Sequence, residues 1–220
     1  MPVTATRPDP PTSYSVLELV ALAPVRNYGS WLTRPLIHVL AYFRVPPNAL
    51  SLSQIPLGIA AAALIKPSPR IALAVFVVAV FFDFLDGELA RHTNSTSKTG
   101  ALVDQISDHV REITVIVGLA VVGALRIDIA IAYALAYPIS NFLLYAAHRA
   151  RRPIRVSIKT WISFYPPLLS FLWFGSNALD FAGCIAVGLM LMSSVYALRN
   201  IRAAVAEARN ESDPPHPAPS

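Results

Sequence analysis

Four aspartates stand close together in a part of the chain that is otherwise mostly apolar. Asp83 and Asp86 follow one apolar run, and Asp104 and Asp108 precede the next. A carboxylate in apolar surroundings costs several kcal/mol unless it is paired, coordinated or hydrated. Four carboxylates would also repel one another. Positive charge must therefore compensate them.

The spacing of these aspartates predicts how they are arranged. In a helix, residues three apart are separated by about 60° and residues four apart by about 40°, so each pair lies on one helix face. Residues 92–100 form a short connection that brings the second helix back beside the first. We therefore expect both pairs to face one cleft and to bind two divalent cations there. Oxygen ligands favour Mg²⁺, or else Mn²⁺ or Ca²⁺, and such ions polarise a pyrophosphate for displacement.

Aspartates at the end of a membrane helix can also be a solvated boundary. One or two carboxylates fit that interpretation, whereas two helically spaced pairs joined by a short turn favour a site. Arg111 and Glu112 follow on nearly the same helix face as Asp104, deeper in the helix. We expect them to pair with each other or with the aspartates.

The composition predicts a membrane protein rather than a soluble or disordered one. The 220 residues are 55% hydrophobic and only 14% charged, whereas soluble domains carry about 25% charged residues. The single cysteine, Cys184, excludes a disulfide framework. We predict an all-α integral membrane protein.

Six segments are apolar enough to be helices that cross a bilayer, which takes about 20 residues each. These predicted spans are 48–65, 71–90, 101–125, 129–147, 156–174 and 178–198. Prolines in the fourth and fifth spans are expected to kink them, at Pro138, Pro166 and Pro167.

The other parts of the chain are more polar. Residues 14–46 contain Pro24 and Pro35 and predict interfacial amphipathic helix rather than a seventh span. The predicted organisation is a disordered N-terminus without a secretory signal, the interfacial segment, a six-helix catalytic domain and a polar tail, at 1–13, 14–46, 47–202 and 203–220.

The positive charges are unevenly distributed between the two sides of this layout. Of the 18 Lys and Arg, only Lys66, Arg70 and Arg126 fall in connections on one side, and Arg111 falls within a span. Because cytoplasmic loops collect Lys and Arg, both termini and the aspartates should be cytoplasmic. This bias also explains the net charge of +5 without any nucleic-acid partner.

The aspartates belong to a longer pattern that resembles the signature of the CDP-alcohol phosphotransferase (phosphatidyltransferase) family of integral-membrane enzymes. The matching residues are Asp83-x-x-Asp86-Gly87-x-x-Ala90-Arg91, then Gly100-x-x-x-Asp104-x-x-x-Asp108. The opening of the first span, 47–51, is similar to the family's Pro-Asn-x-x-Thr pattern, with Ser51 in place of Thr.

The resemblance implies a reaction and a set of roles. A CDP-linked donor, most often CDP-diacylglycerol, would be cleaved by an acceptor hydroxyl, with release of CMP, in phospholipid biosynthesis at the inner membrane. All four aspartates would bind two Mg²⁺ (or Mn²⁺) ions, and Asp108 would also be the general base. A homodimer is implied as well. The implied nucleotide-binding residues are Gly87, Ala90, Arg91, Gly100 and Asn48.

The acceptor is less well defined by the sequence. Arg149, Arg151 and Arg199 close the fourth and sixth spans, where family members that use phosphorylated polyols such as glycerol phosphate or inositol phosphate have basic residues. Charge-assisted bonds from these arginines would hold an acceptor phosphate, although the same residues also fit the topological charge bias. A CDP-choline or CDP-ethanolamine donor is the alternative within the family.

An alternative outside the family is a small divalent-cation transporter that uses the aspartates as its ion site. Transporters carry ionisable residues near mid-span or helices broken in repeated positions. Here the aspartates gather at one membrane interface and no inverted repeat is visible. The sequence therefore favours the enzyme.

Overall fold

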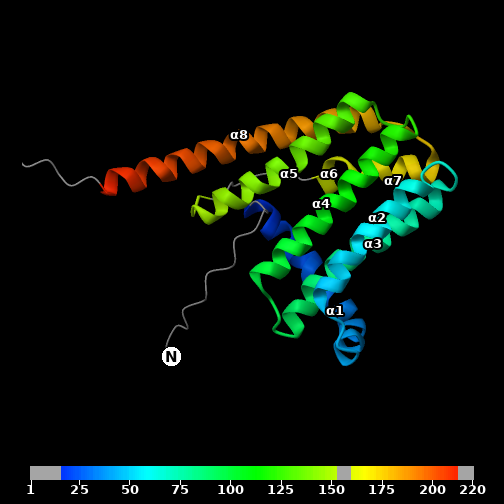
Figure 1. Cartoon of the computed structure of the whole chain (residues 1–220), viewed down its shortest axis with the longest axis horizontal. Coiled ribbons are helices and arrows are strands. Elements are labelled where there is room, and N and C mark those ends of the chain that lie inside the picture. The colour runs from blue at the N-terminus through cyan, green and yellow to red at the C-terminus, as the bar shows by residue number, and fades with distance from the viewer. Residues whose placement is uncertain (1–15, 153–159, 213–220) are drawn as a thin grey trace, which may run out of the picture.

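The computed structural model describes residues 16–152 and 160–212, and all regular secondary structure in these residues is helical (Figure 1). The predicted all-α class is confirmed. The helices are α1 (Val16–Tyr42), α2 (Pro47–Leu64), α3 (Pro69–His92), α4 (Lys98–Val121), α5 (Ile127–Arg149), α6 (Thr160–Ser163), α7 (Tyr165–Phe174) and α8 (Leu179–Ser212).

Helices α2, α3 and α4 pack side by side (Figure 1) and carry the motif residues. The close approach of α2 and α4 depends on small residues. A Cβ added at Gly118 would lie 2.8 Å from the Cβ of Ala62, and one added at Gly58 would lie 3.0 Å from the Cα of Arg111. Small residues at such contacts let helix backbones approach closely. The distance between α2 and α4 is therefore set by close contact between their backbones.

The turn between α3 and α4 brings the two halves of the motif together. Ser97 caps α4, and its Oγ accepts a hydrogen bond of 2.9 Å from the amide of Gly100. Such a cap satisfies one of the free amides of a helix start. The helix begins at Lys98, two residues before Gly100.

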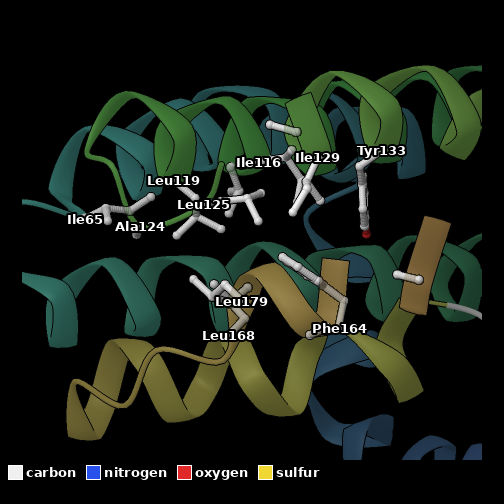
Figure 2. Packing of buried hydrophobic residues seen from close by; sticks show 14 of the residues in the cluster. Ile65, Ile116, Leu119, Ala124, Leu125, Ile129, Tyr133, Phe164, Leu168 and Leu179 are labelled. Carbon is white, nitrogen blue, oxygen red and sulfur yellow. The ribbon is translucent and has the colours of Figure 1, made fainter. Parts of the chain in front are cut away.

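The main hydrophobic core lies toward the other end of α4 and is formed by residues of α2, α3, α4, α5, α7 and α8. Figure 2 shows Leu119 and Ile129 on one side of this core, with Phe164 and Leu168 on the other. Leu119, Phe164 and Leu179 are fully buried. This packing holds the C-terminal half of α4 in place, so the helix that carries Asp104 and Asp108 is rigidly supported.

Helices α5 and α8 lie side by side and run in the same direction, as a long parallel pair (Figure 1). A Cβ at Gly183 would lie 2.6 Å from Cγ2 of Ile129, which shows how closely the two helices pack. Asn200 donates a hydrogen bond of 3.0 Å to the carbonyl of Arg152 and ties α8 to the end of α5.

Within the described residues, two helices are both long and apolar enough to cross a membrane by themselves, Ile127–Arg149 and Leu179–Glu207. Six helical regions coincide with the six predicted spans, but not all have the length and apolarity of an independent span. Helices α3 and α4 carry the acidic residues, and the ten residues of α7 extend only about 15 Å.

Two details differ from the sequence prediction. Helix α1 continues through Pro24 and Pro35 as one helix; helix α5 contains Pro138 without a break. Helix α8 extends to Ser212 and includes the first ten residues of the expected tail, where Glu207 forms an ion pair with Arg152.

The predicted fifth span is broken, and its first residues, 156–159, lie outside the described part of the chain. Helix α6 ends before Phe164 and α7 starts at Tyr165. Pro166 and Pro167 lack an N–H, which carries no penalty in the first turn of a helix. A new helix therefore begins there. The N-terminal segment 1–13 and residues 213–220 of the tail also lie outside the described residues.

Candidate active site

Three of the four aspartates converge between α3 and α4. One carboxylate oxygen each from Asp83, Asp86 and Asp104 lies within 4.8 Å of the others. Asp86 is buried, with 4% of its surface exposed, and the other two are half-buried. The two helices therefore meet at their acidic faces, as the spacing predicts.

Asp108 lies one turn further along α4 and is held in an ion pair. Its Oδ1 lies 2.7 Å from Nη2 of Arg111, which is almost fully buried. The four aspartates thus lie in one region of the molecule, but Asp108 is bonded differently from the other three.

Helix α2 supplies a polar face to this cluster that the sequence interpretation did not assign. Ser51 donates a hydrogen bond of 2.5 Å from Oγ to Oδ2 of Asp86. Gln54 Nε2 lies 3.4 Å from Oδ1 of Asp83 and 3.5 Å from Oδ2 of Asp86. Ser51 and Gln54 are both buried. In the sequence, Ser51 belonged to the family-like opening of this span, and Gln54, three positions later on the same helix face, was the remaining signal for this polar face.

The residues of this cluster fit a hard divalent cation. The oxygens come from carboxylates, the ligands that Mg²⁺ and Mn²⁺ prefer. Oδ1 of Asp104 is buried and has no hydrogen-bond partner among the described residues. A buried carboxylate oxygen without a donor requires compensation, which a bound metal ion would supply.

The residues that the resemblance implies in nucleotide binding lie on α2, α3 and α4, the helices that carry the cluster and its partners. The guanidinium of Arg91 folds over Gly87, where both terminal nitrogens lie 3.4 Å from the position of a Cβ. Arg91 also forms a 2.7 Å ion pair with Glu88. Asn48 meets the start of α4, since its Oδ1 lies 3.3 Å from the position of a Cβ on Gly100. Ala90, also on α3, is half-buried.

Arg111 and Glu112 have different partners, and no direct bond between them is present in the described residues. Of the two expected pairings, with Glu112 or with an aspartate, Arg111 forms the second, with Asp108. It also donates a hydrogen bond to Oε1 of Gln54. Glu112 accepts hydrogen bonds from the hydroxyls of Tyr133 at 2.6 Å and Tyr165 at 2.8 Å. Glu112 therefore links α4 to α5 and α7.

The three arginines proposed for the acceptor are all exposed. Arg149 ends α5, Arg151 follows with a positive φ of 58°, and Arg199 lies on α8. Among the described residues, no hydrogen bond or ion pair joins them to the four aspartates. Residues 153–159, which continue this basic stretch, are outside the described chain.

Comparison with known proteins accounts for this arrangement. Residues 44–208, most of the chain, match the model of the family described as CDP-alcohol phosphatidyltransferase. The chain belongs to this family.

The fold of this CDP-alcohol phosphatidyltransferase is similar to that of a solved structure, Mycobacterium tuberculosis phosphatidylinositol phosphate synthase (PgsA1) with CDP-DAG bound. The TM-score is 0.64 at 16% identity, and the match covers 77% of this chain and 92% of the other. Among curated protein sequences, none gives a significant match.

Family membership makes the protein a transferase of phospholipid biosynthesis in a membrane. It favours the enzyme over the cation transporter considered from the sequence. The matched region begins before α2 and ends within α8, so it includes every residue of the acid cluster.

Proposed function

We propose that this CDP-alcohol phosphatidyltransferase transfers the phosphatidyl group of CDP-diacylglycerol to the hydroxyl of a polar acceptor and releases CMP. The convergence of Asp83, Asp86 and Asp104 within 4.8 Å carries this proposal. Arg91 lies on α3 together with Asp83 and Asp86. Its guanidinium would bind the diphosphate that the aspartates hold through the metal ions.

The aspartates would hold two divalent cations, with Asp83, Asp86, Asp104 and Asp108 as ligands. When bound, such ions neutralise a diphosphate and make its phosphorus more electrophilic. The bare Cα of Gly87 lets a ligand approach the helix backbone. The planar Arg91 guanidinium can donate two hydrogen bonds to phosphate oxygens. To do so, it would leave its ion pair with Glu88. Asn48 and Gly100 would border the nucleotide, with Ala90 keeping that face of α3 low.

Asp108 is proposed as the general base. The acceptor oxygen forms a bond to the phosphatidyl phosphorus, and its proton passes to the Asp108 carboxylate. The bond from that phosphorus to the bridging oxygen breaks, and the electron pair leaves with CMP. The products are a phosphodiester lipid and CMP, so atoms and charge balance.

The favoured acceptor is a phosphorylated polyol such as glycerol phosphate or inositol phosphate. Arg149, Arg151 and Arg199 would bind its phosphate through charge-assisted hydrogen bonds. Their exposed positions at the ends of α5 and in α8 leave them accessible to a ligand from water.

We further propose that six helical regions cross the inner membrane and that both termini and the acid cluster face the cytoplasm. The acyl chains of the donor could then stay in the bilayer while the acceptor comes from water. A homodimer is proposed from the family alone.

The test is CMP release by the purified protein with CDP-diacylglycerol, Mg²⁺ and a panel of alcohols. Asp108→Asn and Asp86→Asn are expected to lower the rate at least about 100-fold, as loss of acid–base or metal chemistry does. Asp128→Asn is the matched control, because Asp128 is exposed and pairs with Arg126 at the opposite end of the bundle.

Two results would overturn the proposal. Full activity of Asp108→Asn would remove Asp108 from the mechanism. CMP release only with diacylglycerol as acceptor and CDP-choline or CDP-ethanolamine as donor would place the protein in the aminoalcohol branch instead.

A further inference from the structure

Arg111 is a fully charged side chain buried in the helix bundle, with only 3% of its surface exposed. A buried charge is tolerated only when it is paired and hydrogen-bonded. The guanidinium has two described partners, Oδ1 of Asp108 and Oε1 of Gln54. It therefore joins α4 to α2 at the depth of the acid cluster.

Gln54 continues this connection to the other aspartates. Its carbonyl oxygen accepts from Arg111, while its Nε2 lies 3.4 Å from Asp83 and 3.5 Å from Asp86. An amide has one acceptor end and one donor end, so Gln54 can satisfy a guanidinium and carboxylates at once. A residue with only donors or only acceptors could not take this place.

The backbone is arranged to admit the arginine. A Cβ at Gly58 on α2 would lie 3.1 Å from Cγ and 3.3 Å from Cβ of Arg111. The missing side chain of Gly58 makes the room through which the stem of Arg111 passes. Glu112, the nearest other acid in sequence, is occupied by Tyr133 and Tyr165, so the charge of Arg111 is directed to Asp108.

We propose that Arg111 and Gln54 act together as a positioning bridge, which fixes the Asp108 carboxylate relative to Asp83 and Asp86. The inference rests on the proposed function, in which all four aspartates bind metal and Asp108 also accepts the proton. The bridge acts through the Asp108 carboxylate. It therefore affects the chemical step more than donor binding.

The bridge predicts a specific kinetic pattern. Gln54→Leu keeps the volume but removes both ends of the amide, and Arg111→Lys keeps the charge but reaches fewer partners. Each is expected to lower kcat by about 10–100-fold, as loss of an orienting partner does. At saturating Mg²⁺, KM for CDP-diacylglycerol and the affinity for CDP measured by calorimetry should stay within about threefold.

The double variant Arg111→Lys/Gln54→Leu separates a bridge from two independent residues. If the two side chains act as one unit, their effects are not additive, and the double variant should be no more than a few-fold slower than the worse single variant. Arg111→Met is expected to be slower than Arg111→Lys, because it removes the positive charge that pairs with Oδ1 of Asp108. Arg126→Met, at the opposite end of the bundle, is the control and should keep the wild-type kcat.

Three outcomes would overturn the bridge while leaving the proposed reaction intact: unchanged kcat in Gln54→Leu, effects that multiply in the double variant, or a loss confined to KM. If Arg111 variants do not fold, the decision rests on Gln54→Leu, which places an apolar side chain in a membrane helix. Absence of CMP release from the wild-type protein with every donor would instead remove the proposed function itself.

Discussion

The Ser51 hydroxyl makes the shortest bond to the acid cluster from α2, at 2.5 Å from Asp86. Ser51→Ala removes a donor that orients a proposed metal ligand, and such losses reduce metal affinity about 10–100-fold. We expect the Mg²⁺ concentration for half-maximal CMP release to rise by that factor. Ser53→Ala is the control, because within the described part of the chain Ser53 donates its hydrogen bond to the carbonyl of Leu50 in its own helix. Equal Mg²⁺ curves for both variants would contradict a role for Ser51.

Glu112 depends on two tyrosine hydroxyls, and each can be removed without changing the ring. Tyr133→Phe leaves Oε1 of a buried carboxylate without its donor, which costs about 1–3 kcal/mol. We expect a lower thermal unfolding temperature in detergent. Tyr196→Phe, at an exposed position of α8, should change stability by less than about 0.5 kcal/mol. A similar unfolding temperature for both variants would show that Glu112 is not stabilised by this bond.

The residues of the site were only partly predictable. Asp83, Asp86 and Asp104 converge because helical spacing and a short turn allow little else. The ion pair of Asp108 with Arg111 also follows an i,i+3 spacing that favours contact. Gln54 could not be assigned, because its contacts depend on how α2 is rotated against α3 and α4. A single helix period does not determine that rotation.

At the scale of elements, the contact between α2 and α4 is the tightest support of the site. Gly118→Ala would place a methyl group 2.8 Å from the Cβ of Ala62, which cannot rotate away. We expect a destabilisation of about 1–3 kcal/mol, as for other overpacked contacts, seen as a lower unfolding temperature. Gly188→Ala is the control, because nothing lies within 4 Å of its added Cβ. That variant should be neutral or slightly more stable, and a neutral Gly118→Ala would mean that the two helices separate without cost.

The helices themselves were well predicted, and their ends were not. Apolar runs gave all six regions because apolarity is a property of each segment alone. The break at Phe164 follows from Pro166 and Pro167, but the same residue type does not break α1 or α5. Whether a proline bends a helix or starts a new one depends on the helices packed around it. The end of α8 likewise depends on contacts with the end of α5.

At the scale of the whole molecule, the acid cluster and the turns expected outside the cytoplasm lie at opposite ends of the bundle. The turns from α2 to α3, from α4 to α5 and from α7 to α8 lie together at one end of the bundle (Figure 1). Lys66, Arg70 and Arg126, the few basic residues expected outside the cytoplasm, belong to this end. The turn from α3 to α4, with the acid cluster beside it, lies at the other end.

This arrangement predicts which turns a reagent can reach from each side of the membrane. In a Cys184→Ala background, Ser176→Cys in the turn from α7 to α8 should react with a membrane-impermeant maleimide in intact spheroplasts. Thr96→Cys, in the turn from α3 to α4, should react only in inverted vesicles, because the positive-inside bias places it in the cytoplasm. Both positions are exposed, so each variant labelled from its expected side is the control for the other. Reaction of both from one side would contradict the proposed crossing between α4 and α7, and exchanged sides would reverse the orientation.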